Sequence, residues 1–63
     1  MSATDAFEAY AASLTEKERE SVRPALAARR TDLMAARSEE ARVRIAEDAI
    51  REIRELLRVQ KRG

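Results

Sequence analysis

The chain of 63 residues contains a single proline, Pro24, and its only glycine is the last residue, Gly63. Alanine, arginine, glutamate and leucine dominate the sequence, and these residues have the most favourable helix propensities. The β-branched residues are scattered and do not alternate with polar residues over any long stretch, as they would in a half-buried strand. The sequence therefore predicts an all-α fold in one structural unit, residues 1–63.

Two helices are predicted in the first half of the chain. The first covers residues 4–13, where apolar residues recur at i, i+3, i+4 and i+7 and so share one face; they are Phe7, Tyr10, Ala11 and Leu14. The second covers residues 16–36. Its start is predicted because Thr15 and Glu18 have the spacing of a capping box, in which each side chain accepts a bond from the other residue's backbone N–H.

Pro24 interrupts the second predicted helix. Proline in a helix interior removes one hydrogen bond and clashes with the carbonyl four residues earlier. We therefore expect a kink near residues 20–24. The alternative is a new helix that is capped by Ser21 and holds Pro24 in its first turn, where the missing N–H is tolerated.

The apolar residues of the second half form two stripes that point in different directions. At about 100° per residue, the stripe of residues 22–36 and the stripe of residues 46–57 would lie about 150° apart on one unbroken helix. One neighbouring helix cannot cover both stripes, so the phase difference favours a turn between them.

The predicted turn lies at residues 36–39. Ser38 is a suitable N-cap, and Glu39 and Glu40 place two carboxylates in the positive first turn of a new helix. We therefore expect a third helix over residues 39–60, so that a short N-terminal helix precedes a helical hairpin. The alternative is one long helix with two differently facing stripes, because no glycine or proline forces a turn there.

A chain of this size is near the lower limit for a domain that folds alone. Much of its 44% hydrophobic content is alanine, which buries little surface. Cysteine and histidine are absent, so neither a disulfide nor a Cys/His zinc site can stabilise the fold. We therefore expect a helix-bundle homodimer or a higher oligomer.

The last predicted helix has the strongest apolar pattern. Its apolar residues follow the three-and-four spacing of helix-on-helix packing, and the stripe is wider than one short helix covers. We expect part of it in the core of the chain and predict an oligomer or partner interface formed by Val43, Ala46, Ala49, Ile50, Ile53, Leu56 and Leu57. Ile45 and Val59 extend the stripe at its edges.

A row of basic residues lies on the polar side of the same helix. Residues 41–63 contain seven basic and four acidic residues. Basic side chains at helical spacing can follow a phosphate backbone, so the alternative function is nucleic-acid binding by Arg44, Arg51, Arg54, Arg58, Lys61 and Arg62. Three features weigh against it: the whole chain has a net charge of only +1, no aromatic residue lies among these residues to stack on a base, and intrahelical pairs Glu40–Arg44 and Glu47–Arg51 are expected.

No pattern in the sequence is typical of a catalytic or metal site. Without histidine or cysteine nothing activates a serine, and no glycine-rich loop is present to hold a phosphate. Asp48, Glu52 and Glu55 share one helix edge, but the Glu-x-x-His signature of di-iron bundles is absent, so we expect a solvated acidic edge. The sequence predicts a protein that is not an enzyme and has no catalytic residue, metal, cofactor or small-molecule substrate.

The sequence also lacks a basic leader and a run approaching the roughly 20 apolar residues of a membrane span. We therefore expect a cytoplasmic protein that does not contact membranes. Together these features predict a small, non-catalytic regulator that self-associates and binds a larger protein. The alternatives are a dimeric nucleic-acid-binding regulator and a chain that folds only on its target.

Overall fold

The computed structural model describes residues 2–62 of the chain, with side chains for residues 2–60. The described residues form four α-helices and no β-strand. The helices are α1 (Ala3–Ser13), α2 (Glu16–Ser21), α3 (Arg23–Ala35) and α4 (Glu39–Arg62). The prediction of an all-α fold is confirmed.

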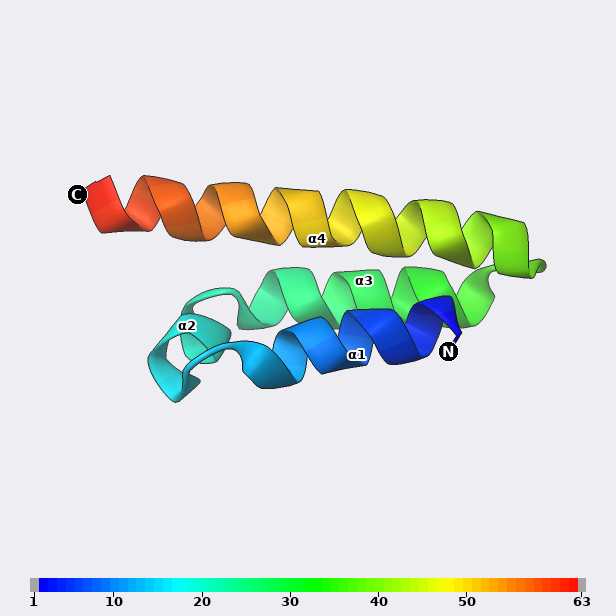
Figure 1. The fold of residues 1–63 in the computed structure, drawn as a ribbon, viewed down its shortest axis with the longest axis horizontal. Helices are drawn as coiled ribbons and strands as arrows, with labels where there is room; N and C mark the ends of the chain where they lie inside the picture. Colours follow the sequence, from blue (N-terminus) through cyan, green and yellow to red (C-terminus); the bar gives the residue numbers. More distant parts are fainter. Residues whose placement is uncertain (1, 63) are drawn as a thin grey trace.

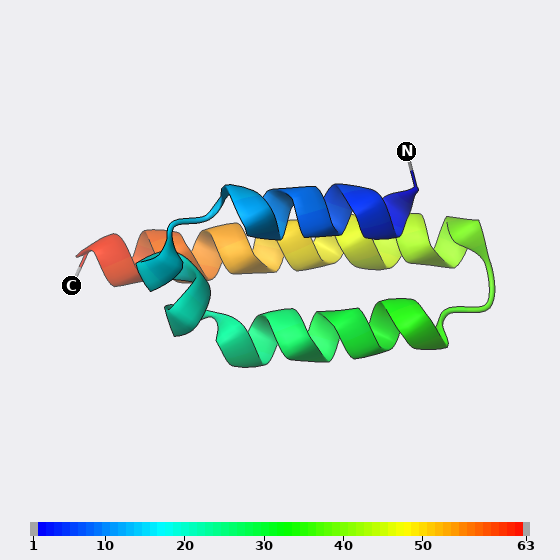
Figure 2. The same cartoon turned by 90° about the horizontal axis from the view of Figure 1, so that it is seen from below.

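The helices form an elongated bundle with principal extents of 38 × 17 × 17 Å. α4 packs against both α1 and α3, while the short α2 lies at one end of the bundle (Figure 1). α1 and α4 run in the same direction and α3 runs in the opposite one, so α3 and α4 form the predicted hairpin. The alternative of one long helix is wrong. The C-terminal end of α4 extends beyond α2 (Figure 2).

The starts of α1 and α2 are fixed by local side-chain caps. The Ser2 hydroxyl accepts a hydrogen bond from the Asp5 N–H at 3.1 Å, so α1 begins at Ala3, one residue before its predicted start. The predicted capping box of α2 is confirmed. Its two bonds join the Glu18 N–H to Thr15 Oγ1 at 3.1 Å and the Thr15 N–H to Glu18 Oε1 at 2.9 Å.

The second predicted helix is two helices, α2 and α3, which are separated at Val22. Val22 has φ −110° and ψ 15°, outside the helical region, and its side chain is buried in the core. Pro24 follows in the first turn of α3. Backbone N–H groups in a first turn have no acceptor within the helix, so the missing N–H of proline costs no hydrogen bond there. Ser21 is not the cap that we considered, because its hydroxyl donates to the Glu18 carbonyl oxygen at 2.8 Å. The break lies within the predicted region.

The predicted N-cap of α4 is confirmed. The Ser38 hydroxyl accepts from the Ala41 N–H at 3.1 Å, and Glu39 and Glu40 occupy the first turn. Glu39 has a second role, because its Oε2 accepts a hydrogen bond from the Ala3 N–H at 3.2 Å. The first turn of α4 thereby also satisfies a backbone donor in the first turn of α1.

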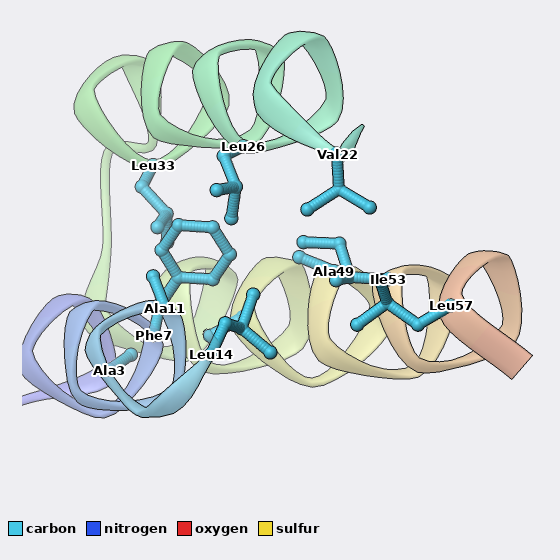
Figure 3. Packing of buried hydrophobic residues seen from close by; sticks show 11 residues of the cluster. Ala3, Phe7, Ala11, Leu14, Val22, Leu26, Leu33, Ala49, Ile53 and Leu57 are labelled. Carbon is cyan, nitrogen blue, oxygen red and sulfur yellow. The ribbon is translucent and has the colours of Figure 1, made fainter. Parts of the chain in front are cut away.

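The core lies between α1, α3 and α4, with further residues from the two junctions that flank α2 (Figure 3). Phe7 and Ile53 are the largest side chains that it encloses fully. The buried hydrophobic residues are Ala3, Phe7, Ala11, Leu14, Val22, Leu26, Leu33, Ala46, Ala49, Ile53 and Leu57. Four of these residues are alanines, Ala3 and Ala11 on α1 and Ala46 and Ala49 on α4.

Candidate interaction surface on α4

The residues of the predicted interface divide into a buried group and an accessible group. The buried group packs within the chain and consists of Ala46, Ala49, Ile53 and Leu57. Of the accessible group, Val43 is 43% exposed, Leu56 is 41% exposed and Ile50 is half-buried against the core. The centre of the apolar stripe thus forms the core of the chain, and only its two edges remain accessible to a partner.

One accessible edge faces α3. Arg29 of α3 lies 3.9 Å from Glu52 of α4, measured from Nε to Oε1. Leu56 and Val59 follow Glu52 by four and seven residues and therefore lie on the same side of α4. Val59 is 60% exposed. This edge presents apolar surface near the C-terminal end of α4.

The Arg29 side chain lies at this edge, and one of its hydrogen-bond donors lacks an acceptor among the described residues. Its Nε is buried and has no hydrogen-bond partner among the described residues. The 3.9 Å separation from Glu52 is an ion-pair contact but is too long for a hydrogen bond. A second contact joins Arg29 Nη1 to Asp32 at 3.3 Å. Arg29 is therefore held between two carboxylates that neutralise its charge.

The other accessible edge faces α1. The guanidinium carbon of Arg54 lies 5.6 Å from the centre of the Tyr10 ring, a cation–π contact between α4 and α1. Ile50 precedes Arg54 by four residues, and Val43 precedes Ile50 by seven, so these side chains share this edge. Sequence reasoning missed Tyr10 as a neighbour of the arginines, because only the packing of α1 on α4 brings the two together.

The arginine row is exposed and pairs differently from the prediction. Arg51 lies 3.6 Å from Asp48, and Arg58 lies 3.9 Å from Glu55. These are contacts between residues three apart on one turn of the helix, with all four side chains largely exposed. Exposed pairs of this kind contribute at most about 1 kcal/mol, so the arginines are available to other anions.

The predicted pairs Glu47–Arg51 and Glu40–Arg44 are not among the ion pairs of the described residues, so that expectation is wrong. Arg44 is exposed. The side chains of Lys61 and Arg62, which completed the predicted basic row, lie outside the described residues.

A shallow, open depression of about 550 Å³ lies along this part of α4. Three arginines, two glutamates and one apolar residue line it: Arg51, Arg54, Arg58, Glu47, Glu55 and Ile50. Acidic side chains therefore interrupt the arginine row, and the surface carries both positive and negative charges.

No group of three or more carboxylates among the described residues is placed to hold a metal ion. This holds for the acidic edge formed by Asp48, Glu52 and Glu55. Within the part of the chain that the structure describes, no helix is both long and apolar enough to cross a membrane.

Comparisons of the chain with models of known protein families, with curated proteins and with solved structures found no match. Its function is therefore inferred from the geometry and chemistry of its own surface.

Proposed function

We propose that this chain is a small, non-catalytic regulatory protein that associates with a second copy of itself and binds a larger protein. The observation that carries the proposal is the apolar surface of α4 that the bundle leaves uncovered. Leu56 is 41% and Val59 is 60% exposed, and both lie on the side of α4 that carries Glu52. Packing of two such helix faces against each other removes this surface from water.

Sedimentation equilibrium tests self-association. We expect a dimer at micromolar concentration and, for the double variant Leu56→Asp/Val59→Asp, a dissociation constant raised at least about tenfold, because two charges would be buried without partners. Met34→Asp is the matched control, since Met34 is 87% exposed on α3. Ile53→Asp and Leu57→Asp are unsuitable, because both side chains belong to the core and their loss would unfold the chain.

Two results would contradict the proposed self-association. One is a well-folded wild-type monomer throughout the micromolar range. The other is dissociation by Met34→Asp as strong as that caused by the double variant, because it would move the interface away from α4. Circular dichroism of each variant confirms that it remains helical.

The alternative function is a small dimeric nucleic-acid-binding regulator that uses the arginine row. Tyr10 supports it, because the structure places an aromatic ring beside Arg54 where the sequence showed none. Glu47 and Glu55 weigh against it, because both line the same depression as the arginines. The oligonucleotide measurement described below separates this function from protein binding.

A further inference from the structure

The edge of α4 that faces α1 combines an arginine in contact with an aromatic ring and accessible apolar side chains. Arg54 lies over the ring of Tyr10, and Tyr10 itself is half-buried against the core. Among the described residues Arg54 has no hydrogen bond or ion pair. The 5.6 Å cation–π contact with Tyr10 is the one interaction of the Arg54 guanidinium among the described residues. Its N–H donors are therefore available to a ligand.

Two further arginines extend the surface along one side of α4. Arg51 precedes Arg54 by three residues and Arg58 follows it by four, so the three guanidinium groups lie on adjacent turns. Arg51 and Arg58 are engaged only by exposed contacts of 3.6 and 3.9 Å to Asp48 and Glu55. An incoming carboxylate can replace these contacts with bidentate hydrogen bonds, the geometry that arginine favours.

Apolar side chains lie next to the arginines. Ile50 lines the depression together with Arg51, Arg54 and Arg58. Val43, which is 43% exposed, lies two turns before Ile50 on the same side of the helix. A ligand that follows this surface therefore meets apolar contacts at the spacing of a helix as well as guanidinium groups.

Glu47 and Glu55 in the lining favour an acidic helix over a nucleic acid as the ligand of this surface. A duplex phosphate backbone carries one charge per about 1.7 Å of axis, so phosphates would also approach Glu47 and Glu55, which line the same depression. An amphipathic helix instead carries its carboxylates at chosen positions and offers leucine or similar side chains to Ile50. We propose that this surface, defined by Val43, Ile50, Arg51, Arg54 and Arg58, docks an acidic amphipathic helix of the larger partner protein.

This inference rests on the proposed function, since it names the chemistry of the partner. It uses the edge of α4 that faces α1, whereas self-association uses Leu56 and Val59 on the edge that faces α3. The two surfaces lie on opposite edges of the buried stripe. The double variant that dissociates the dimer therefore leaves the docking surface intact.

The test uses a fluorescent synthetic peptide of about 18 residues, or five helical turns. Its leucines are placed at i, i+3, i+4 and i+7, its flanks carry glutamate, and its remaining positions are alanine. We expect the 63-residue chain to bind this peptide, as measured by fluorescence anisotropy, and to bind about tenfold more weakly after Arg54→Glu, Arg51→Glu or Val43→Ser. Arg23→Glu is the matched control, because Arg23 pairs with Glu20 on another surface of the molecule.

A double-mutant cycle tests the positioning role of Tyr10. Tyr10→Leu is expected to weaken binding of the acidic peptide in the wild type and to have little further effect when Arg54→Ala is already present. A merely structural effect of Tyr10→Leu would weaken binding equally in both backgrounds, and that result would remove Tyr10 from the site.

Two probes can overturn the inference. In the first, lysine replaces every glutamate of the peptide, and binding as tight as that of the acidic peptide would show that charge complementarity is not used. The second is a labelled oligonucleotide of about 20 nucleotides; if it binds more tightly than the acidic peptide and requires Arg51 and Arg54, the surface is a nucleic-acid site instead. Repeating the peptide titration with Leu56→Asp/Val59→Asp keeps the two proposals separate: unchanged affinity supports docking even if self-association fails.

Discussion

Phe7 illustrates how much of this fold depends on single residues. It is one of the two largest side chains that the core encloses fully, and four of the eleven buried hydrophobic residues are alanines. Figure 3 shows its ring directed into the space between the helices. Little other bulky apolar surface is present to compensate for its loss.

We expect Phe7→Ala to leave the chain largely unfolded. Truncation of a buried phenylalanine costs about 3–5 kcal/mol, and a single core of this size rarely supplies more than about 3–5 kcal/mol in total. Far-UV circular dichroism during thermal melting measures the effect. Met34→Ala, at a site that is 87% exposed, should change stability by no more than about 0.5 kcal/mol. A cooperative melt of Phe7→Ala close to that of the wild type would contradict the importance of this core.

At the scale of elements, one ion pair joins α1 to α3. Arg30 donates from Nε to Glu8 Oε2 at 2.8 Å and from Nη2 to Glu8 Oε1 at 2.9 Å. This bidentate hydrogen bonding lowers the pKa of Glu8 below its ordinary value of 4.5 and raises the pKa of Arg30. Both side chains are close to half-exposed, so solvent screening limits the pair to about 1 kcal/mol or less.

The lowered pKa of Glu8 predicts a specific dependence of stability on pH. Because the ionised carboxylate is favoured in the folded state, its contribution is fully present above pH 4.5 and is lost as the pH falls through the lowered pKa. We expect Glu8→Gln to be less stable than the wild type at neutral pH and the difference to vanish in acid. Thermal melts at a series of pH values measure this, with Glu55→Gln as a control within one helix. A difference that persists unchanged in acid would contradict the assignment.

At the scale of the whole molecule, self-association and stability should be linked. A dimer is stabilised by mass action, so its melting temperature rises with protein concentration. We expect this rise for the wild type over about a hundredfold range of concentration and a constant melting temperature for Leu56→Asp/Val59→Asp. Calorimetry or circular dichroism at each concentration measures it. A concentration-independent wild-type melt would indicate that the 38 Å bundle is complete as a monomer.

Sequence reasoning predicted the features that depend on neighbouring residues. The caps at Thr15 and Ser38 and the turn before α4 are confirmed, because capping bonds join residues three positions apart. Pro24 predicted a break near residues 20–24, but it did not identify Val22 as the residue at which the helix breaks. The break falls at Val22, two residues before Pro24, and the Val22 side chain is buried in the core.

The candidate surface could be predicted only in part. The spacing of apolar residues correctly predicted that α4 is amphipathic. It could not predict which of these residues are buried in the core and which remain accessible. That division depends on where α1 and α3 lie: they cover Ile53 and leave Leu56 and Val59 accessible. Similarly, the contact of Tyr10 with Arg54 joins residues far apart in the sequence.

The amino-acid sequence by itself determined the helical class of this protein and the starts of α2 and α4, and it favoured the hairpin over one long helix. These follow from propensity, capping and the angle per residue, which act within a few positions of one chain. Only the tertiary structure decided which apolar side chains form the core, which remain on the surface, and which arginine contacts an aromatic ring. Those outcomes depend on contacts between helices, whose relative placement no local pattern specifies.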